Sequence, residues 1–264
     1  MPGYRLAIVG ATGLVGQEFI KVLERRGFPI KSIRLLASDR SAGKKLFVSH
    51  QETLVEETAP ESFKDIDIAL FSAGTDVSRY FSPIAVRSGA VVVDNSSAFR
   101  MDPHVPLVVP EINPEDIRKH KGIIANPNCS TIQMVMALYP LHKVISIKRI
   151  IVTTFQSVSG TGAAAVEELT AQSRQLLDGQ DIAPHVYPHQ IAFNALPEIG
   201  GFLDNAYTKE EWKTVEETKK IMHVQDIAIS ATCVRVPVFV GHGEAITMEF
   251  SQAMSPDEAR RILT

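Results

Sequence analysis

Apolar runs alternate with amphipathic patterns through the first half of the chain. Short aliphatic runs predict buried strands, and the segments between them carry apolar residues at helical spacing. The runs lack strict apolar–polar alternation, as expected of parallel strands covered on both faces. The pattern therefore predicts βαβ units, that is, an α/β fold with a Rossmann-like, doubly wound parallel sheet. The predicted strands are 5–10, 32–38, 65–73, 90–97, 106–110 and 122–127, and the predicted helices are 15–27 and 77–89.

The pattern changes after Cys129. Three long β-rich segments follow, at 147–160, 226–241 and 244–251, and the stretches between them are longer. Helical patterns cover 163–177 and 208–222, and a last helix-like stretch closes the chain. This predicts a second α+β domain. We place the boundary after Cys129, giving domains 1–129 and 130–264, which we expect to pack together because no flexible linker separates them.

Composition excludes several classes of protein. The 264 residues suit one large domain or two packed domains, and 45% of them are hydrophobic. A net charge of −3 gives no indication of nucleic acid or of a polybasic membrane patch. No run approaches the roughly 18 apolar residues of a spanning helix. Two cysteines make neither a disulfide framework nor a zinc site. We expect a soluble, cytoplasmic protein without metal, nucleic acid or membrane partner.

A glycine-rich turn follows the first predicted strand. Gly10, Gly13 and Gly16 stand in "GATGLVG", between a strand and a helix. Such glycines let the backbone approach a pyrophosphate, which then sits at the helix N-terminus. The spacing differs from the commoner G-x-G-x-x-G, and a plain structural turn is the alternative. The strand–turn–helix context favours a dinucleotide site. Its predicted contacts include the remaining residues of the turn, Thr12, Leu14 and Val15.

The end of the second predicted strand bears on the choice of cofactor. An NAD site usually has an acid here, and Asp39 is present. Arg40, however, lies between Ser38 and Ser41, and a guanidinium with hydroxyl neighbours suits a 2′-phosphate. We therefore favour NADP, with contacts from Arg40 and Ser41. The alternative is that Arg40 is a solvated loop charge.

Cys129 lies at the start of a predicted helix. Ser130 and Gln133 fit the S-x-x-Q capping box, so we expect Ser130 as the N-cap and Pro140 as the end of the helix. A thiol at a helix N-terminus has a lowered pKa, and backbone N–H groups there can hold an oxyanion. We therefore predict a nucleophile at Cys129, against the alternative of a buried apolar thiol. Cys233 alternates with apolar neighbours and reads as a core residue.

Six segments in order resemble the aspartate-β-semialdehyde dehydrogenase family. They are "GATGLVG", "DNSSAFR", "NPNCST", "QSVSGTG", "EEWKTVEETKKI" and "CVRVPVFVGHGEA", and they extend from Gly10 to Ala245. The resemblance implies NADPH-dependent reduction of β-aspartyl phosphate to aspartate semialdehyde through a cysteine thioester, in the biosynthesis of lysine, threonine and methionine. It implies that 1–129 is the NADP-binding domain and 130–264 the catalytic and dimerisation domain, in a homodimer or homotetramer.

The resemblance also assigns roles to single residues. Cys129 matches the acylated nucleophile and His242 the general acid/base; an imidazole titrates near neutrality and suits proton transfer. Arg235 stands among valines, where a guanidinium needs solvent or an anion, and it matches the group that holds the substrate α-carboxylate. The remaining matches are Gln156 for substrate positioning, Glu210 for the substrate amino group, Arg100, Asn128 and Lys213 for phosphate, and Ser159 and Gly160 for the cofactor.

Alternatives remain at this stage. The helix that carries Glu210 and Lys213 has many i,i+3 and i,i+4 charge pairs, and could be merely solvated. N-acetyl-γ-glutamyl-phosphate reductase shares the acyl-phosphate chemistry. Tyr139 and Lys143 fit the Y-x-x-x-K of short-chain dehydrogenases, although Pro140 argues against a shared helical face. Family chains continue with a β-rich segment and a final helix, so a catalytically inactive NADP-binding form is the non-enzyme alternative.

Overall fold

The computed structural model describes residues 3–49 and 51–264, which fall into two compact units. Unit 1 spans the chain up to Val109 together with Asn113–Pro127. Unit 2 comprises Pro110–Ile112 and Asn128–Thr264. The main division therefore falls after Pro127, two residues before the predicted boundary. Cys129 belongs to unit 2, together with the helix that it begins.

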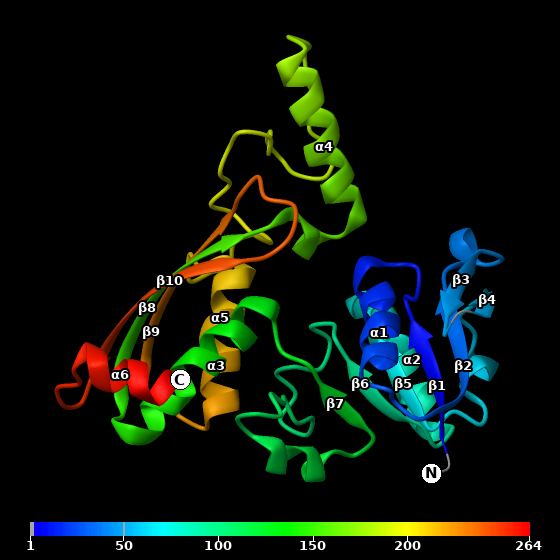
Figure 1. Ribbon diagram of the computed structural model, residues 1–264, viewed down its shortest axis with the longest axis horizontal. Coiled ribbons are helices and arrows are strands. Elements are labelled where there is room, and N and C mark those ends of the chain that lie inside the picture. The colour runs from blue at the N-terminus through cyan, green and yellow to red at the C-terminus, as the bar shows by residue number, and fades with distance from the viewer. Residues whose placement is uncertain (1–2, 50) are drawn as a thin grey trace. The chain divides into compact units, whose positions relative to one another are not determined.

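Unit 1 contains a seven-stranded sheet, among the residues that the structure describes, in the order β3-β4-β2-β1-β5-β6-β7 (Figure 1). Neighbouring strands run parallel except β3 and β4. The strand order reverses at β1, which lies between β2 and β5, and such a reversal is where doubly wound folds bind ligands. The predicted α/β fold is confirmed. The strands are β1 (Tyr4–Val9), β2 (Ile30–Ala37), β3 (Lys45–Val48), β4 (Gln51–Glu57), β5 (Ile68–Phe71), β6 (Val91–Asp94) and β7 (Ile123–Ala125).

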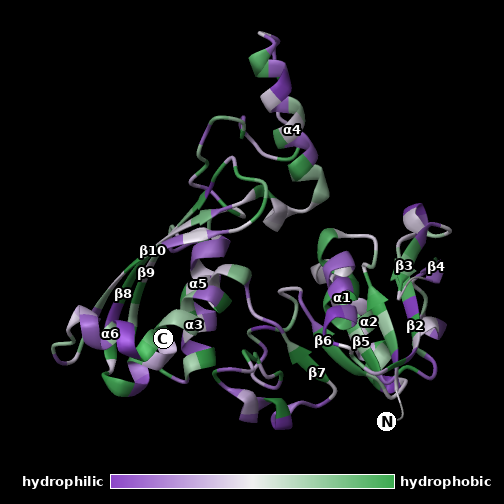
Figure 2. Ribbon diagram, in the orientation of Figure 1, coloured by the Kyte–Doolittle hydropathy of each residue, from purple (hydrophilic) through white to green (hydrophobic). Residues whose placement is uncertain are grey.

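Helices cover both faces of this sheet. Helix α1 (Leu14–Arg25) buries Ile20 against Ile8 and Leu35, and α2 (Thr75–Arg87) buries Ala85 in a second cluster on the other face. Because both faces are covered, residues 6–9 of β1 and all of β7 are apolar (Figure 2). Three short 3₁₀ helices complete unit 1: η1 (Asp39–Ser41), η2 (Pro60–Phe63) and η3 (Pro114–Lys119).

Two parts of unit 1 differ from the prediction. The segment 106–110 forms only an isolated bridge from Leu107 to Ala125 rather than a full strand. The β3–β4 hairpin was not predicted, because most of its side chains are exposed and polar. A strand at the edge of a sheet needs few apolar residues, so its sequence gives a weak pattern.

Unit 2 is built on a three-stranded sheet, in the order β10-β8-β9. Strand β8 runs parallel to β9 and antiparallel to β10. The unit has the predicted α+β composition, and the helix predicted at 163–177 is confirmed (Figure 1). Its elements are α3 (Cys129–Val144), β8 (Ile147–Gln156), η4 (Val158–Thr161), α4 (Ala163–Leu177), α5 (Lys209–Met222), β9 (Ala228–Arg235), β10 (Gly243–Phe250) and α6 (Pro256–Leu263).

Helices α3 and α5 pack on one face of this sheet. Met134 and Leu138 of α3 and Val215 of α5 form a buried cluster with strand residues that include Ile150. The opposite face is open, and Ile151 and Phe155 on β8 are 49% and 44% exposed. Helix α4 extends away from the sheet and is held by a separate apolar cluster with the loop that follows it (Figure 1). Unit 2 therefore has one covered sheet face and one uncovered, partly apolar face.

Candidate active site

The glycine turn of unit 1 borders a cavity of about 550 Å³ at the carboxyl ends of the strands. Gly10 has φ of +86°, and a Cβ there would lie 2.5 Å from the carbonyl oxygen of Ser72. A Cβ on Gly16 would lie 2.2 Å from the Gly10 oxygen. Both positions therefore require glycine, because a side chain at Gly10 would meet the backbone that follows β5 and one at Gly16 would meet the turn that follows β1. The cavity lies at the strand-order reversal, beside the first turn of α1.

Four of the predicted cofactor residues in unit 1 line this cavity. They are Gly10, Thr12, Gly13 and Arg40. Ser38 and Asp39 also line it, whereas four other predicted residues do not, namely Leu14, Val15, Gly16 and Ser41. Leu14 and Val15 form the exposed start of α1. The cavity thus combines glycine backbone, a helix N-terminus and a guanidinium, which is the donor set that a dinucleotide with a 2′-phosphate requires.

Cys129 is the first residue of α3, and Asn128 is its N-cap. The Asn128 side-chain oxygen accepts hydrogen bonds from the backbone N–H groups of Ser130 and Thr131. The predicted cap at Ser130 is therefore wrong: Ser130 is buried inside the first turn. Asn and Ser are comparable caps, so local preference could not decide between them. Cys129 is exposed and is the first residue of the helix, whereas the prediction placed it just before the helix.

Pro140 does not end this helix, which continues to Val144. A proline inside a helix leaves the carbonyl four residues earlier without its donor. That residue is Met136, whose side chain is 39% exposed, so water can reach this side of the helix. Tyr139 and Lys143 consequently share a helical face, with the Lys143 ammonium 5.8 Å from the tyrosine ring centroid. The argument from Pro140 against a shared face was therefore wrong.

His242 contacts the Cys129 sulfur. Its Nε2 lies 3.1 Å from Sγ, although the two residues are 113 positions apart in the sequence. Its Nδ1 accepts a hydrogen bond from the backbone N–H of Ser157 at 3.0 Å and lies 3.2 Å from the Ser157 hydroxyl. Burial lowers the pKa of His242, and the positive charge of Arg235 lowers it further. The predicted pair of thiol and imidazole is thus in direct contact within unit 2.

Arg235 lies beside the histidine and is 5% exposed. Its Nη1 donates to the Ser157 carbonyl at 2.7 Å, and its buried Nε has no hydrogen-bond partner among the described residues. An orphaned guanidinium N–H in a buried position is costly unless an anion or water meets it. The site therefore retains capacity to bind a carboxylate. A Cβ on Gly160 would lie 3.1 Å from Arg235 Nη1 and 3.5 Å from His242 Cε1, so a side chain there would crowd both groups.

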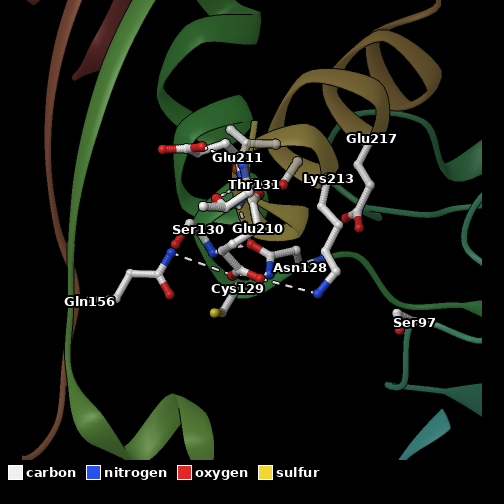
Figure 3. Close-up of polar contacts among 12 residues, drawn as sticks. Ser97, Asn128, Cys129, Ser130, Thr131, Gln156, Glu210, Glu211, Lys213 and Glu217 are labelled. Carbon is white, nitrogen blue, oxygen red and sulfur yellow. Dashed lines mark hydrogen bonds and ion pairs between the residues drawn. The ribbon is translucent and has the colours of Figure 1, made fainter. Parts of the chain in front are cut away.

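Glu210 connects the polar groups behind the sulfur (Figure 3). Its Oε1 accepts from Asn128 Nδ2 at 2.7 Å and from Gln156 Nε2 at 3.4 Å, and its Oε2 accepts from Lys213 at 3.1 Å. Burial alone would raise the pKa of Glu210, but Lys213 and the hydrogen bond from Asn128 outweigh it and lower the pKa. Glu210 is therefore a buried carboxylate, and the solvated-helix alternative for α5 is wrong for this face.

Glu217 and Ser157 are site residues that the sequence did not single out. Glu217 is 1% exposed, and its Oε2 accepts from the backbone N–H of Asn128 at 2.6 Å. Together with Glu210 it fixes both the backbone and the amide of Asn128, which caps the helix of the nucleophile. The helical spacing could have identified Glu217, because residues 210 and 217 are seven positions apart and share one face of a helix. No local pattern marks Ser157, whose contacts join β8 to residues far along the chain.

The remaining predicted residues divide between the units. Arg100 lies in unit 1 at 7% exposure, and its Nη2 donates to the carbonyl of Asn95 at 2.9 Å. The loop that carries it is fixed by Asp94, a buried carboxylate that accepts from Ser78 and Ser96. Ser159 and Gly160 lie in unit 2 beside His242, with the Ser159 hydroxyl 3.0 Å from that of Ser157.

The described residues contain neither a metal-binding cluster nor a membrane-spanning helix. They contain no group of three or more His, Cys, Asp or Glu side chains that could hold a metal ion. None of their helices combines the length and the apolar character that crossing a bilayer requires. Cys233 is buried, as predicted for a core residue, and its burial raises the pKa of the thiol to about 11.

Comparison with known proteins identifies the family. Residues 5–120 match the family model "Semialdehyde dehydrogenase, NAD binding domain", and residues 138–264 match "Semialdehyde dehydrogenase, dimerisation domain". The aspartate-semialdehyde dehydrogenase of Aquifex aeolicus is 56% identical over 265 aligned residues, which cover 99% of this chain and 78% of that protein. The chain belongs to the aspartate-semialdehyde dehydrogenase family.

Solved structures of family members share the fold of the whole chain. Aspartate-semialdehyde dehydrogenase II of Vibrio cholerae, complexed with ASA, has a TM-score of 0.97 and 45% identity, covering 99% of this chain and 79% of that one. The Candida albicans enzyme with NADP has a TM-score of 0.72 and 28% identity, covering 98% and 75%. Membership of this family disfavours the reductase and short-chain dehydrogenase alternatives.

Proposed function

We propose that the protein is an NADP-dependent aspartate-semialdehyde dehydrogenase. It reduces β-aspartyl phosphate to aspartate semialdehyde and, in reverse, oxidises the semialdehyde in the presence of phosphate. The observation that carries the proposal is the exposed Cys129 sulfur at the start of α3, 3.1 Å from Nε2 of His242. Names of relatives at 56% and 45% identity, one of them solved with ASA, support the substrate.

The cysteine carries the covalent chemistry. Its thiolate attacks the acyl carbon, and phosphate leaves with the electron pair of the C–O bond, so a thioester forms on Cys129. NADPH, when bound, would supply the hydride that reduces the thioester on Cys129 to a thiohemiacetal anion. Re-formation of the carbonyl then expels the Cys129 thiolate and frees the aldehyde. The first turn of α3 assists because its positive end favours both the thiolate and an oxyanion close to it.

Polar groups around the sulfur orient the substrate. Arg235, with its unpartnered Nε, is proposed to hold the α-carboxylate, and Glu210 to meet the α-ammonium group. Gln156 donates to Glu210 from β8 and is proposed to position the acyl group. Lys213, Arg100 and Asn128 are proposed to contact phosphate. The Asn128 amide keeps one N–H for this contact, because its oxygen caps α3 and its other N–H binds Glu210.

The cavity of unit 1 is proposed to bind NADP. Its glycine backbone and the start of α1 suit the pyrophosphate, and Arg40 with Ser38 suits a 2′-phosphate. The relative solved with NADP supports the same cofactor. Residues 1–129 would then be the NADP-binding part and residues 130–264 the catalytic and dimerisation part, with Ser41, Ser159 and Gly160 as further candidate cofactor contacts.

We also propose a homodimer, or a tetramer of dimers, formed through the open face of the unit 2 sheet. Ile151 and Phe155 on that face are exposed, and residues 138–264 match a dimerisation-domain model. A cytoplasmic location, and a place in lysine, threonine and methionine biosynthesis, complete the proposal. Two free thiols, one of them used in catalysis, fit a reducing compartment.

The direct test is NADP-dependent oxidation of aspartate semialdehyde in phosphate buffer. The unmodified chain should reduce NADP, and Cys129→Ala should lose at least about a thousandfold in rate. Cys233→Ser alters the other thiol and should retain the chemistry. N-acetylglutamate semialdehyde, assayed in parallel, should be a poor substrate. Equal inactivity of the unmodified chain and Cys129→Ala, with NADP still bound, would leave only a dinucleotide-binding protein.

A further inference from the structure

We propose that Asp94 is a positioning residue for phosphate: its buried carboxylate sets the shape of loop 95–100 and thereby the place of Arg100. The proposal rests on the proposed function, in which Arg100 contacts phosphate, and all the residues that carry it belong to unit 1. It predicts that loss of the carboxylate weakens phosphate binding selectively, with little change for the semialdehyde or NADP.

Asp94 is the last residue of β6, and its side chain is fully buried. Its Oδ1 accepts from the Ser78 hydroxyl on α2 at 2.8 Å and from the backbone N–H of Ser96 at 2.9 Å. Its Oδ2 accepts from the Ser96 hydroxyl at 2.8 Å. Both carboxylate oxygens are therefore engaged, and two of the three donors belong to the loop that follows the strand.

The three donors to Asp94 are neutral groups, two hydroxyls and one amide. Removing a carboxylate from water is costly, and neutral donors offset less of that cost than a cation would. An apolar side chain could fill the end of β6 without this cost, so stability alone does not account for the carboxylate. A carboxylate can accept at both of its oxygens, and this holds Ser96 by its amide and its hydroxyl at the same time.

The contact with Ser96 extends along the loop to Arg100. The Ser96 hydroxyl, which donates to Asp94, also accepts from the backbone N–H of Ala98 at 3.1 Å. Two successive turns, each closed by a side-chain oxygen, thus shape the loop. At its end the Nη2 of Arg100 donates to the carbonyl of Asn95 at 2.9 Å, and Arg100 is buried. The place of the guanidinium therefore depends on how the loop folds back beside Asp94.

The start of the loop is held by contacts that do not involve the Asp94 carboxylate. The backbone N–H of Asn95 donates to the carbonyl of Phe71 on β5 at 2.9 Å, and its side-chain oxygen accepts from Asn126 at 2.7 Å. Loss of the carboxylate should therefore leave Asn95 in place and free the residues that follow it. The expected consequence is a displaced Arg100 in an otherwise intact unit 1.

A displaced guanidinium should affect phosphate before the other reactants. Arginine binds phosphate through directed N–H groups, so its contribution depends on where the guanidinium lies. The groups proposed to hold the semialdehyde are Arg235 on β9 and Glu210 on α5, and the cavity proposed for NADP is lined by residues outside 95–100. KM for phosphate should therefore rise, while KM for the semialdehyde and KM for NADP change little.

The first experiment measures the three KM values for oxidation of the semialdehyde by variants of the full chain. Ser96→Ala keeps the backbone N–H but loses the bridging hydroxyl, and it should raise KM for phosphate roughly tenfold. Asp94→Ala should raise it at least as much. Asp94→Asn keeps one acceptor oxygen and should raise it less. Asp76→Asn alters an exposed acid on α2 and should leave all three KM values unchanged.

The pattern of these KM values separates a positioning role from a merely structural one. An equal rise for phosphate, semialdehyde and NADP, or no rise for phosphate, would overturn the inference. Asp94→Ala combined with Ser96→Ala should be little worse than the more affected single variant, because both changes break one contact. Effects that multiply in the double variant would contradict the route through Ser96.

The second experiment needs no turnover. Hydrogen exchange of the peptide that covers 95–100 is followed by mass spectrometry, and Asp94→Ala should speed it several-fold while β5 and β6 keep their protection. If Asp94→Ala does not fold, Ser96→Ala releases the Ala98 amide and gives the same test. Unchanged exchange in 95–100 would overturn the inference even in an active enzyme. An unmodified chain that oxidises no semialdehyde would instead refute the proposed function, whatever the exchange shows.

Discussion

Removal of the Glu217 carboxylate should destabilise unit 2 and slow catalysis together. Glu217 is 1% exposed, and its Oε2 accepts the backbone N–H of Asn128 at 2.6 Å. Glu217→Ala leaves that N–H buried without this acceptor, which costs about 1–3 kcal/mol. For a chain of this size each kcal/mol corresponds to roughly 2–4 °C of unfolding temperature. A fall of about 2–12 °C is therefore expected for Glu217→Ala.

The chemical effect follows from what Asn128 does. Its side chain caps α3, and the next residue is the nucleophile, so loss of its position should lower kcat more than it raises KM. Glu217→Gln keeps an oxygen that can accept the hydrogen bond from Asn128, so its unfolding temperature and its kcat should both fall less. Thermal unfolding followed by circular dichroism and initial rates of semialdehyde oxidation measure the two effects.

The adjacent residue supplies a matched control. Glu216 is a partly exposed acid one position earlier on α5, 3.6 Å from Lys219. Such a pair contributes little, so Glu216→Ala should shift the unfolding temperature by no more than about 2–4 °C. If Glu217→Ala is as mild as Glu216→Ala in both assays, the assignment of Glu217 as the support of Asn128 is wrong.

Three further outcomes are expected. Arg40→Ala should weaken NADP roughly tenfold or more and NAD much less, measured by fluorescence titration; equal losses would contradict a 2′-phosphate contact. Burial raises the pKa of Glu244 to about 7, so the native state holds a proton that the unfolded chain releases near pH 4.3, and stability should fall as the pH rises from there through 7. Glu244→Gln should remove that fall in urea midpoints, and an unchanged profile would count against it. Hydrogen bonds from Arg5 lower the pKa of Asp67 to about 2, so Asp67→Asn should be less stable than the parent above pH 4, with the difference vanishing as the pH falls through 2.

The fold of unit 1 was predictable because burial on both faces makes the inner parts of its central strands mainly apolar. Strands β5 and β6 fall inside predicted runs, and β1 and β2 overlap predicted runs but begin one and two residues earlier. The β3–β4 hairpin was not predictable in this way, because it forms the sheet edge and its side chains are mostly exposed. β4 pairs with β2, and β3 pairs with β4, through backbone hydrogen bonds. Such bonds do not depend on the hydropathy of the side chains.

The site was only partly predictable. The local sequence predicted that Cys129 lies at the N-terminus of a helix. The role of His242 beside it was predicted only from the family resemblance. The sequence could not predict that Asn128, and not Ser130, is the N-cap of α3, because both residue types cap helices well. Glu210 and Glu217 on α5 settle it by contacts more than 80 positions away in the sequence. Sequence periodicity equally allowed α5 to be solvated, and only the packing of the chain reveals which of its carboxylates are buried.

Helix α5 also determines which kinds of mutation this segment can tolerate. Three carboxylates of this one helix accept hydrogen bonds from other elements. Glu210 and Glu217 both bind Asn128, and Glu211 binds the backbone N–H of Cys233. Successive residues of an α-helix are rotated by roughly 100° about its axis. Inserting or deleting one residue between Glu210 and Glu217 would therefore rotate one of these carboxylates away from Asn128. Exposed positions of this segment should therefore vary freely in side chain during evolution, whereas its length should remain constant.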